Sequence, residues 1–272
     1  MIPQHVPYKT DFKFGATLLG DAGFDTSWAS RLHSVIGAAV SSKTANREFE
    51  KLLLKNKDKL IYRPVLTGFG GTELEPGVPK PEKILEQVRE IVEKGFPTSH
   101  VTLYVSPIFP VDWVPYIKET FGIDYLEMLH YILDEAKSIG ITKVFQGFFD
   151  MDYLTMTVLR RFDERLFINP YEWHFDEFKE ISLKVMEPSL EYVTNDPFYP
   201  FARLTGIADN EDLKTLKLDR VYRFANPFDY VKNILELIVN PAKDCPGKCK
   251  ICHLGNEFKY SPIEGRWILP EK

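Results

Sequence analysis

The sequence predicts an α/β protein built on a parallel sheet, as a complete or partial (β/α) barrel. Apolar, β-rich segments alternate with amphipathic helical segments in about six β-then-α units, an alternation typical of a parallel sheet. No G-x-G-x-x-G pattern opens a helix, which disfavours a doubly wound nucleotide-binding sheet. The chain has 272 residues, of which 44% are hydrophobic, so it can bury a sizeable core.

Hydrophobic periodicity predicts the elements of the first half of the chain. Helices are expected where charged and apolar residues recur at helical spacing, most clearly where Ile84, Val88 and Ile91 share one face. Strands are expected where short apolar runs end at glycine or proline. We therefore expect strands at 12–19, 60–67, 100–106 and 142–149, and helices at 26–40, 43–55, 81–94, 125–139 and 153–162.

The second half continues the same alternation. No linker rich in Gly, Ser or Pro divides the chain, so a single domain over 1–272 is the simplest interpretation, with a metal-binding segment at 241–272. A small hairpin is expected around Gly265. The remaining predicted elements are helices at 173–185, 211–216 and 227–239, and strands at 201–207 and 220–224.

All three cysteines of the chain lie within eight residues. Cys245, Cys249 and Cys252 have the spacing C-x3-C-x2-C, and His253 follows directly. An odd number of thiols cannot form a complete set of disulfides, whereas three thiols on one loop suit a metal. A structural zinc site with three cysteines and a histidine is one reading. A [4Fe–4S] cluster held at three corners is the other, and the close packing of the four candidate ligands disfavours zinc.

A glycine-rich turn follows the predicted strand at 60–67. Its Gly70 and Gly71 allow the backbone to approach a ligand closely, and Glu73 supplies a carboxylate beside them. In a barrel, loops that follow strands surround the site where chemistry takes place. The alternative is an ordinary turn between a strand and a helix with a solvent-facing acid.

The cysteine spacing, with the hydrophobic Ile251 before Cys252, resembles the C-x3-C-x-Φ-C pattern of the radical SAM superfamily. The chain also resembles an uncharacterised family that carries its cysteine triad at the C-terminus and is distantly akin to spore photoproduct lyase. The matching segments are the turn at 67–76, the strand at 101–107, residues 148–153, and the triad itself.

This resemblance implies that the three cysteines ligate a [4Fe–4S] cluster whose open iron binds S-adenosylmethionine. It further implies that Gly70, Gly71 and Glu73 correspond to a GGEP-like segment that holds the methionine amino group. Typical members of the superfamily carry the triad after the first strand. The resemblance therefore implies a barrel that is permuted, with the cluster loop near the C-terminus.

Two further polar residues lie in predicted strands. Gln146 is expected to point into the barrel, where its amide could bind cofactor ribose or a buried partner. Arg203 has apolar neighbours and needs an anion, either the carboxylate of S-adenosylmethionine, a substrate phosphate or a structural carboxylate. The sequence does not identify a catalytic residue.

Charge and composition limit the partners. A net charge of −5 and a pI of about 5.8 provide no global basic field for long nucleic acid. No segment has the ~18–20 apolar residues of a membrane-spanning helix, nor the pattern of a signal peptide, so we expect a reducing, cytoplasmic location. We expect a radical SAM enzyme that uses flavodoxin or ferredoxin and modifies or repairs a small molecule or nucleotide. The alternative is a non-enzymatic binding protein with a structural zinc site.

Overall fold

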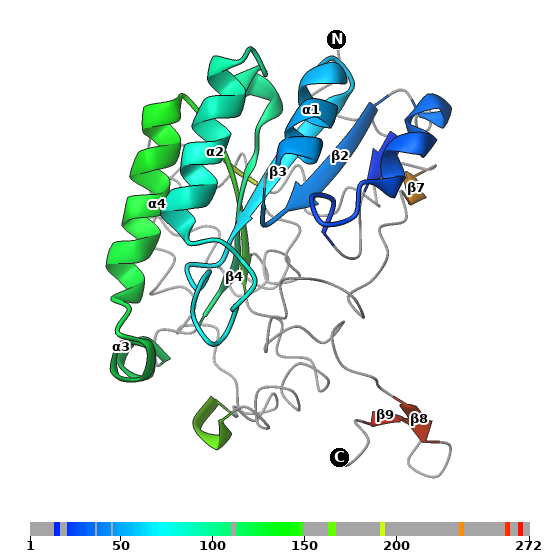
Figure 1. Cartoon of the computed structure of the whole chain (residues 1–272). Helices are drawn as coiled ribbons and strands as arrows, with labels where there is room; N and C mark the ends of the chain where they lie inside the picture. Colours follow the sequence, from blue (N-terminus) through cyan, green and yellow to red (C-terminus); the bar gives the residue numbers. More distant parts are fainter. Residues whose placement is uncertain are drawn as a thin grey trace, which may run out of the picture.

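The structure, a computed structural model, describes residues 14–16, 21–35, 37–44, 46–109, 113–148, 163–166, 191–193, 234–236, 259–261 and 266–268. These residues form an α/β fold built on a parallel sheet, with helices packed against one of its faces (Figure 1). The predicted fold class is therefore confirmed at the level of an α/β protein with a parallel sheet.

Seven of the described strands form one sheet in the order β6-β5-β4-β3-β2-β1-β7, and every pairing within it is parallel. From β1 to β6 each strand lies beside the strand that precedes it in the chain, and β7 lies on the other side of β1. The carboxyl ends of all seven strands consequently face the same edge. The strands are β1 (Phe14–Ala16), β2 (Gly37–Ser42), β3 (Leu60–Leu66), β4 (Leu103–Ile108), β5 (Lys143–Phe148), β6 (Glu191–Val193) and β7 (Ile234–Glu236).

Three α-helices lie side by side over the sheet: α1 (Arg47–Lys55), α2 (Pro81–Glu93) and α4 (Tyr125–Ile139), with α3 (Val114–Phe121) below α4 (Figure 1). Local signals set their ends. The side chain of Asn46 caps α1 by accepting hydrogen bonds from the first backbone N–H groups of the helix. Gly140, with a φ of 87°, ends α4. The short 3-10 helices are η1 (Ser27–Ser34), η2 (Thr98–His100) and η4 (Glu164–Leu166).

Strand β3 alternates between the two faces of the sheet. Leu60, Tyr62 and Leu66 are buried toward the helices, whereas Arg63 and Val65 are only partly buried on the opposite face. This period of two is what a strand with a helix-covered face requires. The helix-covered face of β3 therefore belongs to the hydrophobic core.

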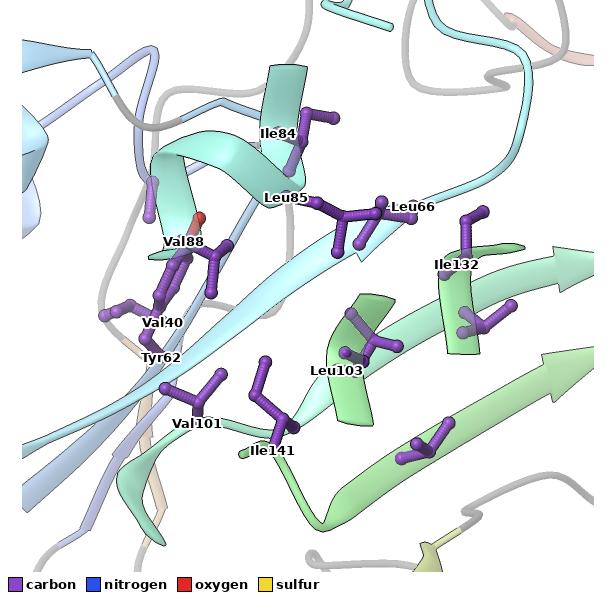
Figure 2. Close-up of a cluster of buried hydrophobic side chains, with 14 of the residues drawn as sticks. Val40, Tyr62, Leu66, Ile84, Leu85, Val88, Val101, Leu103, Ile132 and Ile141 are labelled. Atoms are coloured by element: carbon purple, nitrogen blue, oxygen red, sulfur yellow. The ribbon is translucent and has the colours of Figure 1, made fainter. Parts of the chain in front are cut away.

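The core lies between the sheet and α1, α2 and α4. Figure 2 shows side chains of α2 and α4 packed against those of β2, β3 and β4. Complete burial of one such side chain contributes about 1.5–3 kcal/mol, so this layer provides most of the stabilisation of the described fold. The residues labelled in Figure 2 are Val40, Tyr62, Leu66, Ile84, Leu85, Val88, Val101, Leu103, Ile132 and Ile141.

One predicted helix is wrong in its second half. The segment predicted as a helix at 26–40 forms the 3-10 helix η1 and then strand β2, with the extended Val35 ending η1. Residues Ala38 and Val40 are fully buried, and β2 pairs with both β1 and β3. A short run of small apolar residues is compatible with either a helix or a strand, and here pairing with β1 and β3 makes it a strand.

The other predicted elements divide into three groups. The strands at 60–67, 100–106 and 142–149, the helices at 81–94 and 125–139, and the hairpin near Gly265 are confirmed, with ends that agree within three residues. The helix predicted at 43–55 is confirmed as α1, which begins four residues later, and the strand predicted at 12–19 is confirmed over Phe14–Ala16, the part of it that the structure describes. The hairpin consists of β8 (Lys259–Ser261) and β9 (Arg266–Ile268). The helix predicted at 227–239 is wrong at Ile234–Glu236, because β7 pairs there with β1. The sequence did not predict α3 or β6. The elements predicted at 153–162, 173–185, 201–207, 211–216 and 220–224 lie outside the described residues.

Candidate functional site

The candidate site is centred on the loop that follows β3. Gly68 and Gly71 have φ values of 88° and 78°, a conformation that glycine adopts at little cost. Gly70 is required for a different reason, because a Cβ there would lie 1.9 Å from the carbonyl oxygen of Pro79. The glycines therefore allow the loop to fold closely against its own later residues.

The loop closes on itself between Gly70 and Glu75. These two residues form an isolated parallel bridge, and the backbone N–H of Gly71 donates to the carbonyl oxygen of Glu75 at 3.1 Å. The hydroxyl of Thr72 donates to the carbonyl oxygen of Phe69 at 2.6 Å. This compact turn directs the side chain of Glu75 into the protein.

Glu75 is the buried acid of the loop. Its residue is 0% exposed, and its two carboxylate oxygens have different partners. One oxygen, Oε2, accepts a hydrogen bond from the hydroxyl of Thr67, and the other, Oε1, pairs with the ammonium group of Lys43. A buried carboxylate needs such partners, because an unpaired buried charge is strongly destabilising.

Lys43 and Thr67 come from neighbouring strands. Lys43 is the first residue after β2, and Thr67 is the first residue after β3. Because parallel strands end at the same edge of the sheet, both side chains meet the loop there. The side chain of Lys43 is 22% exposed, so its charge lies between the buried carboxylate and the solvent.

Asp21 extends this arrangement to the segment after β1. Its Oδ1 accepts hydrogen bonds from the backbone N–H of Gly23 at 2.8 Å and of Phe24 at 3.2 Å, and from the hydroxyl of Ser42 at 2.6 Å. Its Oδ2 accepts from the backbone N–H of Lys43 at 2.6 Å. One carboxylate thus links the segment after β1 to the end of β2.

Burial raises the pKa of Asp21 above its ordinary value, although the hydrogen bonds from Lys43, Ser42, Gly23 and Phe24 act in the opposite direction. Burial also raises the pKa of the Tyr62 phenol, and the charge of Asp21 adds to this effect. Both shifts indicate an environment that disfavours negative charge.

Asp21, Lys43, Thr67 and Glu75 therefore form one polar cluster at the carboxyl edge of β1, β2 and β3, which we call the strand-end cluster. It contains two carboxylates and one ammonium group. The carboxyl edge is where open and closed parallel sheets bind their ligands. The adjoining backbone of the glycine loop suits close contact with a ligand.

A second cationic residue lies on the face of the sheet opposite the helices. The guanidinium carbon of Arg63 in β3 lies 5.7 Å from the centroid of the Tyr104 ring in β4. Burial lowers the pKa of Arg63 from its ordinary value, and the nearby Tyr104 acts in the opposite direction. An arginine side chain is effectively always protonated in proteins. This face therefore contains a charged group as well as apolar residues.

The structure brings three of the predicted site residues together on one loop. Gly70 is buried against Pro79, whereas Gly71 and Glu73 are exposed. Gln146 lies in β5, two strands away from β3, where it pairs with Val105. The predicted cofactor-binding roles of these residues stay predictions.

Arg203 and the three cysteines lie outside the described residues. The last strand before the cysteines is described: β7 ends at Glu236, nine residues before Cys245, and it runs parallel to β1. The carboxyl end of β7 consequently lies at the same edge of the sheet as the strand-end cluster.

Sequence reasoning missed Asp21, Lys43 and Thr67, and it named Glu73 as the acid of the loop, with Glu75 only as a second candidate. A usable signal was present for Lys43 and Thr67, because each directly follows an apolar strand, the position where barrels carry functional residues. No sequence signal separates Glu73 from Glu75, since both lie in the same turn and only the closure of the loop decides which is buried.

Among the residues that the structure describes, no group of three or more His, Cys, Asp and Glu side chains is arranged to hold a metal ion. None of the described helices combines the length and apolar character needed to span a bilayer. No family model matches the chain, and no curated protein matches it.

Proposed function

We propose that this protein is a radical SAM enzyme in which Cys245, Cys249 and Cys252 ligate three irons of a [4Fe–4S] cluster. The observation that carries the proposal is the C-x3-C-x2-C spacing, which brings three thiolates together on one loop and leaves one iron of a cubane open. When bound, the cluster would accept one electron from a flavodoxin or ferredoxin and cleave S-adenosylmethionine to methionine and a 5′-deoxyadenosyl radical, which takes a hydrogen atom from the substrate.

The order of the strands supports this proposal. The strands from β1 to β6 follow one another across the sheet, and β7 returns to the side of β1. This order is compatible with a complete or partial (β/α) barrel, which we propose as the fold. A cluster loop that follows β7 would begin beside β1, as a barrel with its cluster loop contributed last requires.

The glycine loop supports a cofactor site at the same edge. Gly71 and Glu73 are exposed there, and the Lys43–Glu75 pair fixes the loop from beneath. We propose that the backbone near Gly70 and Gly71 and the carboxylate of Glu73 help to bind S-adenosylmethionine. Gln146 and Arg203 are proposed as further cofactor contacts on sequence grounds alone.

The chemistry of the proposal also limits the partners. Thiolate ligands must stay reduced, which suits the cytoplasm. The acidic chain suits a small-molecule or nucleotide substrate better than long nucleic acid. The enzyme would modify or repair that substrate.

A structural zinc site in a binding protein is the second candidate, favoured by one observation. His253 stands directly after Cys252, and three cysteines with one histidine are a common zinc-binding set. The two candidates assign different roles to this histidine, since only the zinc site would use it as a ligand.

Anaerobic reconstitution with iron and sulfide tests the proposal. We expect a brown protein with roughly four irons and four sulfides per chain, and release of 5′-deoxyadenosine after reduction in the presence of S-adenosylmethionine. A colourless protein that retains one tightly bound zinc under the same conditions would refute the proposal that this protein is a radical SAM enzyme.

Three variants assign the ligands. Cys249→Ala is expected to abolish the cluster and the release of 5′-deoxyadenosine, whereas the neighbouring Lys250→Ala is expected to retain both. His253→Ala separates the candidates, because it should leave an iron–sulfur cluster intact and should weaken zinc binding. Normal release of 5′-deoxyadenosine by Cys249→Ala would contradict the assignment.

A further inference from the structure

We propose that Asp21 is a positioning residue, which holds the backbone of Lys43 and thereby sets the Lys43–Glu75 ion pair and the glycine loop that this pair fixes. The consequence for S-adenosylmethionine rests on the proposed function, whereas the mechanical coupling does not. The proposal follows from a chain of contacts that crosses the ends of three strands.

The first step is the contact between Asp21 and the end of β2. The carboxylate accepts hydrogen bonds from the Ser42 hydroxyl and from the backbone N–H of Lys43, each at 2.6 Å. A hydrogen bond to a charged acceptor is stronger than one between neutral groups. The position of the Lys43 backbone therefore depends on Asp21.

The second step runs through Lys43 itself. Its backbone N–H donates a hydrogen bond to Asp21, and its side-chain ammonium group pairs with Glu75, so one residue makes both contacts. A shift of the Lys43 backbone would move the origin of the side chain that neutralises a fully buried carboxylate. Any such movement is costly, because the carboxylate has no access to water.

The third step leads from Glu75 to the loop. The Glu75 carboxylate accepts from the Thr67 hydroxyl, whose oxygen in turn accepts from the backbone N–H of Phe69 at 3.1 Å. The Glu75 carbonyl oxygen accepts from the N–H of Gly71. In the described residues Asp21 makes no hydrogen bond to this loop, so its influence passes through Lys43.

Asp21 is not needed merely to hold its own turn against β2, because other hydrogen bonds already do so. The segment is also tied to β2 by the backbone N–H of Ala22, which donates to the carbonyl oxygen of Ser41 at 2.9 Å. The buried indole N–H of Trp28 donates to the carbonyl oxygen of Ala22, also at 2.9 Å. Burial disfavours the charge of Asp21, so a carboxylate at this position has a stability cost that a neutral residue would avoid.

Hydrogen exchange of the unliganded full-length chain tests the coupling. The probe is the set of backbone N–H groups in residues 68–78, measured by mass spectrometry under native conditions. In Asp21→Asn the amide nitrogen must face either the N–H of Lys43 or the three donors on Oδ1, so a contact is lost in both orientations. We expect exchange in 68–78 to become about tenfold faster or more, the factor for losing a hydrogen bond to a charged group.

A double-variant cycle separates positioning from general destabilisation. Lys43→Met should accelerate exchange in 68–78 at least as much, and Asp21→Asn combined with Lys43→Met should be no faster than Lys43→Met alone. Ser42→Ala is the control: it removes a donor to Asp21 and the contacts of the Ser42 hydroxyl with the backbone of Thr44, but it keeps the hydrogen bond from the Lys43 N–H to Asp21, and it should therefore change exchange in 68–78 less than Asp21→Asn does. Additive effects of Asp21→Asn and Lys43→Met would overturn the proposal, as would an unchanged loop in Asp21→Asn.

A second variant keeps the test decisive if Asp21→Asn does not fold. In Asp21→Ser the hydroxyl can still accept from the N–H groups of its own turn but is too short to reach Lys43. It should reproduce the fast exchange in 68–78, and normal exchange there in a folded Asp21→Ser would overturn the proposal.

The cofactor provides a separate readout. In the reconstituted protein, Asp21→Asn should raise the apparent KM for S-adenosylmethionine about tenfold with a smaller change in kcat, because a positioning residue acts on binding of the loop's ligand. Faster exchange without any cleavage of S-adenosylmethionine by the wild type would refute the proposed function and leave the coupling intact. Cleavage by the wild type with additive exchange effects would refute only the coupling.

Discussion

Lys43 and Glu75, which are 32 residues apart in the chain, form an ion pair at the carboxyl edge of the sheet. The carboxylate is fully buried and the lysine side chain is 22% exposed. The pair fixes the loop after β3 to the end of β2. The carboxylate of Glu75 has no contact with water and depends on Lys43 for its counter-charge, whereas the ammonium group of Lys43 still reaches water. Loss of Lys43 alone should therefore destabilise the fold more than loss of both charges.

Lys43→Met should lower the free energy of unfolding by about 3 kcal/mol, because it leaves the buried carboxylate of Glu75 without its counter-charge. Adding Glu75→Gln to Lys43→Met should recover part of this loss, since the uncompensated charge is then removed. Urea denaturation at pH 7 measures both. A double variant that is less stable than Lys43→Met would contradict the account of this pair.

Gly70→Ala should be among the most destabilising substitutions in the loop. The new Cβ would lie 1.9 Å from the carbonyl oxygen of Pro79, a backbone atom that cannot move without moving the loop, and we expect a loss of about 3 kcal/mol. Gly122→Ala is the matched control, because a Cβ there meets nothing within 4 Å and only its φ of 66° is unfavourable, at a cost of about 1 kcal/mol. Thermal unfolding of the two variants gives the comparison, and equal losses would contradict the steric argument.

Asp21 should make the stability depend on pH in the direction opposite to that of most carboxylates. Burial raises its pKa above the ordinary 3.8, so the folded protein binds its proton more tightly than the unfolded chain. The destabilisation by Asp21 is therefore complete above the raised pKa and disappears as the pH falls through that pKa toward 3.8.

Asp21→Asn removes this dependence. The stability of the wild type relative to Asp21→Asn should rise as the pH is lowered from 7 toward 4, as measured by urea denaturation at each pH. A relative stability that falls on acidification would mean that the hydrogen bonds to Asp21 outweigh its burial.

Local patterns predicted β3 and the glycine loop because each has a strong signal of its own. The strand is an apolar run that ends at glycine, and the loop has three glycines, which no regular element accommodates. By contrast, the residues 37–40 have no distinctive period, and their strand follows from pairing with β1 and β3. A property that depends on neighbours in the sheet cannot be taken from one segment alone.

The same limit applies to the strand-end cluster. Lys43 is one of several lysines that follow an apolar segment, and Glu75 is one of two acids in its turn. Their partnership arises only when β2 and β3 become neighbours and the loop closes on Gly70. The sequence therefore singled out the glycine loop, and the fold selects which side chains meet it.

Tyr62→Phe should be neutral or stabilising by about 1 kcal/mol. The side chain of Tyr62 is completely buried, and its hydroxyl has no hydrogen-bond partner among the described residues. Removing a buried polar group without a partner removes the free energy needed to take it out of water, while the ring keeps its packing against Phe49 at a centroid distance of 5.5 Å. Urea denaturation at pH 7 measures the change.

Tyr125→Phe is the matched control, because this equally buried tyrosine uses its hydroxyl. Its oxygen accepts a hydrogen bond from the backbone N–H of Phe109 at 3.1 Å, so the substitution leaves a buried donor without that acceptor. We expect a loss of about 1–2 kcal/mol for Tyr125→Phe. If Tyr62→Phe is as destabilising as Tyr125→Phe, the hydroxyl of Tyr62 has a hydrogen-bond partner in the folded protein, and the account of Tyr62 as a buried group without one is wrong.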